Sequence, residues 1–138
     1  MSTESNKTLM DRFRDFINTA DSDTANELIS ADASFYVPGR PAPLRGPAGY
    51  LEIIAMMRRG FPDIQWTIEE LISEGNSVAA RFTMRGTHRG DFFGVPATGN
   101  KITVQALNIY HLSDGKIVEE YGQPDMLGLM QQIGASPT

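Results

Sequence analysis

An aspartate and a histidine in the last third of the chain have side chains and a spacing that suit acid–base chemistry. Asp125 follows Pro124 where an expected strand gives way to a short apolar helix, and His111 stands 14 residues earlier. At the mouth of one cavity, the carboxylate could act as a base that removes a proton from a substrate. The imidazole could then donate to the oxygen that gains negative charge. These two residues are the catalytic candidates.

Each of the two also has a purely structural interpretation. An acid after proline is an ordinary way to begin a helix, and the helix macrodipole stabilises the charge there, which works against a base. His111 could equally be a strand-end histidine with one nitrogen in water. The sequence does not decide which face of the strand over 101–112 lines a cavity, because both faces are mixed in polarity.

Six further residues are candidates for contacting a substrate. They are three aromatic residues that could form a pocket wall, a histidine after an apolar strand face, a glutamine on the face of His111, and a tyrosine hydroxyl near Asp125: Tyr36, Trp66, Phe92, His88, Gln105 and Tyr121. Aromatic surface usually means packing. For His88 a structural hydrogen bond is the simpler interpretation.

Composition excludes several classes of site. The 138 residues contain no cysteine, which removes disulfides, thiolate catalysis and zinc–thiolate sites. The only two histidines, His88 and His111, lie in unrelated segments, so no metal site is expected. No glycine-rich loop of the dinucleotide-binding type follows a strand, and we expect no cofactor.

Charge and hydropathy restrict the partners and the location. The net charge is −5 and the basic residues are scattered, so neither nucleic acid nor an anionic membrane is an expected partner. The polar N-terminus does not have the form of a signal peptide, and no window approaches the roughly 20 apolar residues of a membrane span. We therefore expect a cytoplasmic protein.

Hydrophobic periodicity predicts the order of the elements. Helical spacing appears over about 7–20, 24–29 and 47–60, and strands are expected over 33–37, 64–72, 78–85, 101–112 and 116–121, with a helix beginning near Pro124. Asp114-Gly115 predicts a tight hairpin. Helices that precede an antiparallel meander indicate an α+β domain over 1–138, with 1–6 a disordered start and 135–138 a tail. A curved sheet around helices leaves a pocket, and its other face suggests a homodimer.

The element order and local strings resemble the SnoaL-like polyketide cyclases, a branch of the nuclear-transport-factor-like superfamily. The strings include RGPAGY and SDGKIVEEYGQPDMLGLMQQIG. The resemblance implies a cone-shaped α+β barrel in which a curved antiparallel sheet wraps around the N-terminal helices and a central pocket. It also implies that Asp125 is the general base and His111 its partner. The chain departs from the family pattern at Tyr121, where tryptophan is common, and at Ile109, where glutamine is favoured.

The resemblance implies a cyclase or isomerase acting on a polyketide-like or other hydrophobic carbonyl compound by cofactor-free acid–base chemistry. Two alternatives stay open, because this scaffold carries many functions. One is a non-catalytic small-molecule binder or stress-associated protein. The other is an epoxide hydrolase, which would need a second pocket carboxylate beside a water. Convergence of Asp125 and His111 on one cavity would favour the enzyme.

Overall fold

The computed structural model describes residues 3–134. In this range the chain runs in the order α1 (Thr3–Thr19), α2 (Ser22–Leu28), β1 (Ile29–Tyr36), β2 (Leu44–Arg45), α3 (Gly46–Gly60), β3 (Gln65–Glu74), β4 (Ser77–Thr87), β5 (Lys101–Ser113), β6 (Lys116–Tyr121) and α4 (Met126–Gln132). None of these helices is long and apolar enough to cross a membrane.

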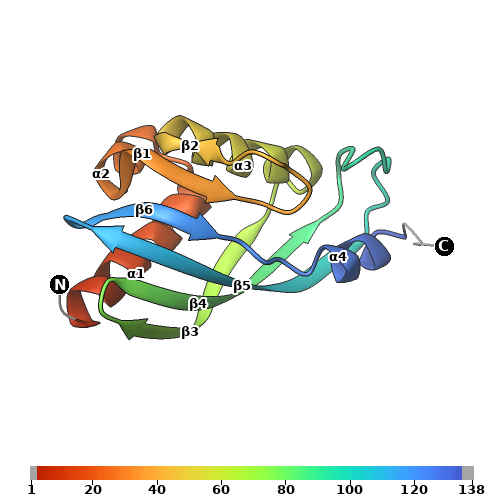
Figure 1. Ribbon diagram of the computed structural model, residues 1–138. Helices are drawn as coiled ribbons and strands as arrows, with labels where there is room; N and C mark the ends of the chain where they lie inside the picture. Colours follow the sequence, from red (N-terminus) through yellow and green to blue (C-terminus); the bar gives the residue numbers. More distant parts are fainter. Residues whose placement is uncertain (1–2, 135–138) are drawn as a thin grey trace.

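The six strands form one open, curved sheet in the order β2-β1-β6-β5-β4-β3 (Figure 1). The α+β class is therefore confirmed. The sheet is mixed rather than wholly antiparallel, because β1 runs parallel to β6 while the other neighbours are antiparallel. No hairpin connects β1 to β6, so chain connectivity does not force them to be antiparallel. Register shifts in the β1–β6, β3–β4 and β5–β6 pairs interrupt the ladder, and such bulges bend a strand.

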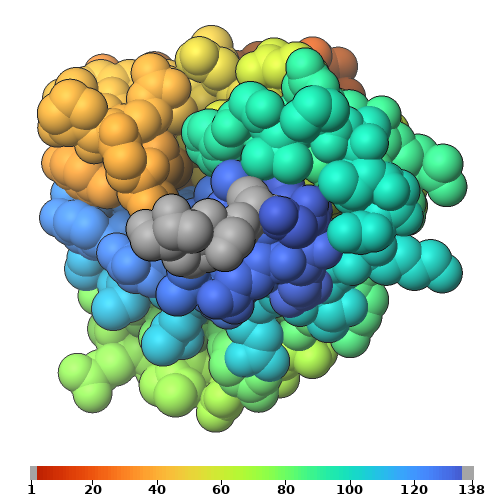
Figure 2. All heavy atoms as spheres, turned by 90° about the vertical axis from the view of Figure 1, so that its right-hand side faces the viewer, coloured from red at the N-terminus to blue at the C-terminus, as the bar shows by residue number. Residues whose placement is uncertain are grey.

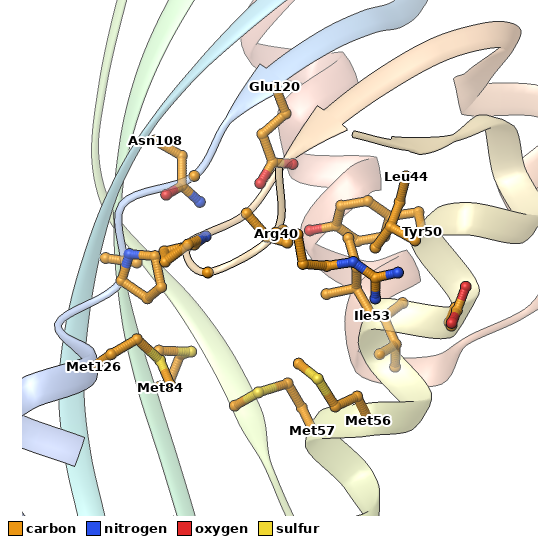
Figure 3. Close-up of a pocket in the computed structure, with 18 of the residues that line it drawn as sticks. Arg40, Leu44, Tyr50, Ile53, Met56, Met57, Met84, Asn108, Glu120 and Met126 are labelled. Carbon is orange, nitrogen blue, oxygen red and sulfur yellow. The ribbon is translucent and has the colours of Figure 1, made fainter. Parts of the chain in front are cut away.

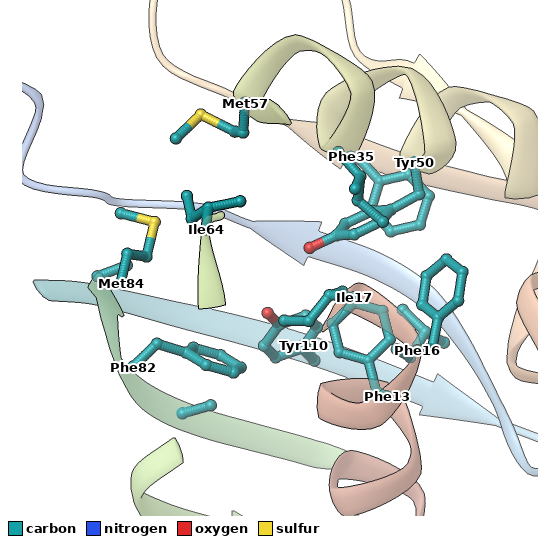
Figure 4. Packing of buried hydrophobic residues seen from close by; sticks show 14 of the residues in the cluster. Phe13, Phe16, Ile17, Phe35, Tyr50, Met57, Ile64, Phe82, Met84 and Tyr110 are labelled. Carbon is teal, nitrogen blue, oxygen red and sulfur yellow. The ribbon is translucent and has the colours of Figure 1, made fainter. Parts of the chain in front are cut away.

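One face of the sheet is covered by α1 and α3, and the core lies between these layers (Figure 4). Its centre is aromatic. The ring of Phe13 lies 5.1 Å from that of Tyr50 and 5.5 Å from that of Tyr110, and Tyr50 also meets Phe35 at 4.8 Å. Because these rings come from α1, α3, β1 and β5, their burial ties the helices to the sheet. Tyr50 and Tyr110 thereby bring hydroxyl groups into the interior.

The N-terminal helices differ from the prediction at their starts. The first helix begins at Thr3 rather than near Lys7, and Asn6 in the segment expected to be disordered is buried. Its amide donates to Ser73 Oγ at 3.0 Å and to the Gly75 carbonyl at 2.9 Å. The second helix is capped by Asp21, which accepts from the Thr24 N–H. Residues 1–2 and the expected tail over 135–138 lie outside the described residues.

The predicted hairpin between β5 and β6 is present, but a bulge follows it. Ser113 pairs with Lys116 around Asp114 and Gly115, which have positive φ angles of 52° and 75°. The register then shifts, so His111 pairs with Glu119 rather than Val118. Regular alternation would have placed Glu120 opposite Ile109, whereas the structure pairs it with Tyr110. The bulge therefore turns the Glu120 side chain towards the helices.

Candidate active site

A cavity of about 520 Å³ lies between α3 and the concave face of the sheet, at the end of the molecule that carries α4. Figure 3 shows methionines at one end of this cavity and polar groups at the other. The apolar end contains Met57, Met84 and Met126, and Trp66 and Ile53 add to the wall. A cavity of this size, mostly apolar with a few convergent polar groups, is typical of a site for a drug-sized small molecule.

The central polar group of the cavity is the carboxyl of Glu120. This side chain lines the cavity and is only 5% exposed. Burial raises the pKa of Glu120 to about 8, while the hydroxyls of Tyr110 and Tyr50 act in the opposite direction. Among the described residues the Oε1 atom has no hydrogen-bond partner. The carboxyl therefore retains an acceptor position that a ligand could use.

Two tyrosines and an amide surround this carboxyl. Burial raises the pKa of Tyr50 and of Tyr110 well above 10, and the charge of Glu120 is the second largest cause. Both hydroxyls therefore stay protonated. Asn108 donates through Nδ2 to the Tyr110 oxygen at 3.2 Å and accepts from the Gln123 N–H at 2.9 Å. This chain of bonds fixes the orientation of the Asn108 amide. Figure 3 shows Asn108 and Tyr50 on either side of Glu120.

The glycine at position 122 leaves the approach to Glu120 open. A Cβ atom on Gly122 would lie 3.2 Å from Glu120 Oε2 and 3.8 Å from Asn108 Oδ1. The backbone N–H of Gly122 donates to the Tyr36 carbonyl at 3.0 Å, which anchors the segment after β6 beside β1. Gly122 also lines the cavity, so the space beside the carboxyl belongs to the site.

The structure places Asp125 outside this cavity. Its side chain is exposed and accepts the Gly128 N–H at 2.9 Å, so it is the N-cap of α4. Its neighbours Pro124 and Met126 line the cavity, but Asp125 does not. The structural interpretation of Asp125 as a helix start accounts for its position.

His111 lies on the outer face of the sheet. Its Nδ1 atom is 3.0 Å from Ser77 Oγ, and its Nε2 atom is 3.7 Å from a Glu119 oxygen. The backbone N–H of Asp125 donates to Gln105, six residues before His111 on the same strand, so the two candidates stand roughly 20 Å apart. The expected convergence of Asp125 and His111 is therefore absent.

The substrate-contact candidates divide between the two faces of the sheet. Trp66 lines the cavity, as expected. Tyr36 and Tyr121 instead stack on each other at 4.8 Å with an interplanar angle of 6°, and both are partly exposed. Gln105 occupies an exposed position of β5 in line with His111. Alternation along β5 places its odd-numbered residues outside and its even-numbered residues inside, which explains why Gln105 faces outward with His111.

The two candidates from the loop over 88–100 are buried away from the cavity. His88 lies 2.9 Å through Nδ1 from Thr98 Oγ1 and accepts the Thr98 N–H at 3.2 Å through the same nitrogen, while its buried Nε2 atom has no hydrogen-bond partner among the described residues. Phe92 packs against Phe61 with ring centres 5.0 Å apart. The next residue, Phe93, lines the cavity in its place.

Sequence reasoning missed Glu120, Asn108 and Tyr50. One signal was available for Asn108: it is the only strongly polar residue among the even-numbered positions 102–112, which are otherwise apolar or tyrosine. Glu120 gave no such signal, because its inward direction depends on the bulge. Within residues 3–134 no group of three histidine, cysteine, aspartate or glutamate side chains is arranged to hold a metal ion.

The fold and the partly open, largely apolar cavity define a small-molecule site on an α+β scaffold, and comparison with known proteins gives the family. The model of the SnoaL-like polyketide cyclases matches residues 7–133. The chain belongs to the SnoaL-like polyketide cyclase family.

Relatives and solved structures agree with this assignment. The aklanonic acid methyl ester cyclase of Streptomyces peucetius is 30% identical, with 91% of this chain and 88% of that protein covered. The nogalonic acid methyl ester cyclase of Streptomyces nogalater is 28% identical, with 85% and 88% covered. The structure of IdmH from Streptomyces antibioticus has a TM-score of 0.84 at 31% identity, covering 93% of this chain and 97% of that one. TsrD from Streptomyces laurentii superposes with a TM-score of 0.86 at 26% identity over 99% of both chains.

Proposed function

We propose that this cavity is the active site of a cyclase or isomerase for a polyketide-like carbonyl compound, with Glu120 as the general base. The observation that carries the proposal is a buried carboxyl, with one oxygen free, facing an apolar cavity in a chain of the cyclase family. Two of the relatives named above are, by name, cyclases of aklanonic acid methyl ester and nogalonic acid methyl ester. A largely apolar cavity bordered by methionines suits a bulky hydrophobic molecule.

The proposed reaction begins when ionised Glu120 takes a proton from a carbon between two carbonyl groups. Once Glu120 is neutral, the Tyr50 hydroxyl that had donated to it turns to the enolate oxygen, which also accepts from the Asn108 amide; both side chains line the cavity. The enolate carbon then attacks a second carbonyl and forms the new carbon–carbon bond. Neutral Glu120 returns its proton to the resulting alkoxide. Because the proton is returned and nothing is oxidised or reduced, we expect no cofactor requirement.

A matched pair of substitutions tests this assignment. Glu120→Gln keeps the shape of the side chain but removes the proton acceptor, so turnover should fall by about 10²–10⁴-fold. Asp125→Asn makes the same chemical change five residues along the chain, outside the cavity, and turnover should stay near that of the wild type. The assay would use anthraquinone-type polyketide esters and cyclic enones. Normal turnover by Glu120→Gln, or a comparable loss in Asp125→Asn, would contradict the proposal.

The two alternatives predict different results in the same experiment. A non-catalytic binder would hold the polyketide ester without turnover in the wild type. An epoxide hydrolase would need a second carboxylate near Glu120. Among the described lining residues the only other carboxylate is that of Glu52, which lies at an exposed position of α3. The burial of Glu120 beside two hydroxyl donors favours enolate chemistry over both alternatives.

A further inference from the structure

An aromatic residue stands exposed at the cavity. Phe93 is 62% exposed and lines the cavity, whereas its neighbour Phe92 is 3% exposed and belongs to the core. Figure 2 shows the loop over 88–100, in teal, beside α4 and facing the segment after β1 in orange, at one end of the molecule. Single exposed apolar residues are common on monomers, so the exposure of Phe93 points to a role only because its ring also lines the cavity.

The backbone at Phe93 is poorly suited to phenylalanine. Phe92 and Val95 exchange backbone hydrogen bonds of 3.0 and 2.9 Å around Phe93 and Gly94, whose φ angles are 47° and 80°. Positive φ at both central residues defines a type I′ turn, for which Asn-Gly is the preferred sequence. A bulky residue with φ above zero is an outlier that directs attention to function. Phe93 thus contributes neither good turn geometry nor a buried ring.

The loop that carries Phe93 is attached to the core at several points. The Gly60 carbonyl accepts the N–H groups of Arg89 and Gly90 at 3.0 and 3.2 Å. Phe92 packs so closely over Gly60 that a Cβ there would come within 2.8 Å of its ring. The Phe93 ring meets the edge of Phe92 at 4.6 Å with an interplanar angle of 70°. These contacts hold the exposed ring at the side of the cavity.

We propose that Phe93 is a substrate-recognition residue whose ring packs against a flat aromatic ring of the ligand and so selects polycyclic aromatic ketones over saturated ones. Aromatic pairs gain energy beyond the burial of their area, which would offset the unfavourable turn. The proposal rests on the cavity being the substrate site, as argued above. It assigns specificity, however, and not chemistry.

Binding measurements with two probes test the proposal. The aromatic probe is 1,8-dihydroxyanthraquinone and the saturated probe is 1-decalone, a ketone without an aromatic ring. Phe93→Asn creates the Asn-Gly turn and should raise or preserve the melting temperature. It should weaken anthraquinone binding by about tenfold, in line with the loss of an aromatic pair, and leave decalone binding unchanged. Phe93→Tyr keeps the ring and should bind both probes as the wild type does.

Other outcomes would overturn the proposal. The proposal fails if Phe93→Asn binds the anthraquinone as tightly as the wild type or more tightly, or if it loses affinity for both probes equally. It also fails if the wild-type protein prefers decalone or binds no anthraquinone. These binding measurements do not depend on turnover. A failed assignment of Glu120 as the base would therefore appear only in the activity of Glu120→Gln and would leave this result intact.

Discussion

At the scale of single residues, the central feature is a buried carboxyl whose pKa the fold raises to about 8, so that it is mainly protonated at pH 7. Two buried tyrosine hydroxyls adjoin Glu120, and burial has the largest influence on its pKa. Burial of an unpaired charge is costly, so the folded state favours the neutral acid. A carboxyl with a pKa near the working pH can both accept and return a proton.

This pKa has a consequence for stability. The pKa of Glu120 is raised from 4.5 to about 8 on folding, so between these values the folded state holds a proton that the unfolded state has lost. The free energy of unfolding should therefore fall as pH rises from 4.5 to 8, by on the order of a few kcal/mol. Urea unfolding of Glu120→Gln across this range should lack that fall. Glu119→Gln changes the adjacent, outward-facing side chain and should retain the fall in stability with pH. If the free energy of unfolding depends on pH equally in both variants, the raised pKa of Glu120 is contradicted.

Gly122 offers a second test at this scale. In Gly122→Ala the new methyl group would crowd the Glu120 carboxyl from 3.2 Å, at a backbone conformation that alanine can adopt. Turnover should fall roughly ten- to hundredfold, because small displacements of a reacting group are costly. The melting temperature should change little. Full turnover in this variant would show that the space beside the carboxyl is not used.

At the scale of elements, one bulge decides which glutamate belongs to the site. The sequence predicts the hairpin at Asp114-Gly115 from turn chemistry, and the structure confirms it. The sequence does not predict the extra residue at Val118, because a bulge depends on how the whole sheet curves and not on local preference. With regular alternation, Glu120 shares a face with Ile109. The bulge instead pairs Glu120 with Tyr110, on the face that borders the cavity.

Elsewhere in the chain, too, features that depend on local sequence were predictable, and features that depend on contacts between distant segments were not. Helices, the long strands and the α+β class follow from periodicity, which is local. The parallel pairing of β1 with β6 and the inward face of β5 depend on contacts between distant segments. Trp66 was found because a large aromatic residue at an alternating position commonly faces the interior. Asp125 and His111 were chosen on spacing, which does not report the face of the sheet on which a side chain lies.

The stability of α4 should depend on the side chain that caps its N-terminus. Asp125 caps the helix through the Gly128 N–H, so Asp125→Ala should lower the free energy of unfolding by about 1 kcal/mol. Asp125→Asn, which can still cap, should lose much less. Chemical denaturation of both variants measures this difference. Equal stability of the two variants would argue against the capping role.

At the scale of the whole molecule, the outer face of the sheet carries an apolar row. Cross-strand pairing places four residues side by side from β3 to β6, and Tyr36 of β1 extends the row: Ile72, Ala79, Ile109 and Tyr121. Of these, Ile72, Ile109, Tyr121 and Tyr36 are exposed large side chains. We propose that this row is the interface of a homodimer, because a contiguous apolar row on a surface usually meets a partner.

Light scattering tests the dimer. The wild type should have twice the mass of the 15.2 kDa chain at micromolar concentration. Ile109→Lys places a charge in the middle of the row and should give a monomer with an unchanged circular dichroism spectrum. A monomeric wild type would exclude the dimer and leave the cavity, which lies on the opposite face of the sheet, unaffected.

The pH dependence of kcat/KM tests the central claim most directly. If ionised Glu120 is the base, kcat/KM for a polyketide ester should rise with pH and level off above an apparent pKa of about 8. In Glu120→Gln the residual rate should be low and lack this limb. A wild-type profile that is flat between pH 6 and 9, or a limb that persists in Glu120→Gln, would contradict the assignment of Glu120 as the general base.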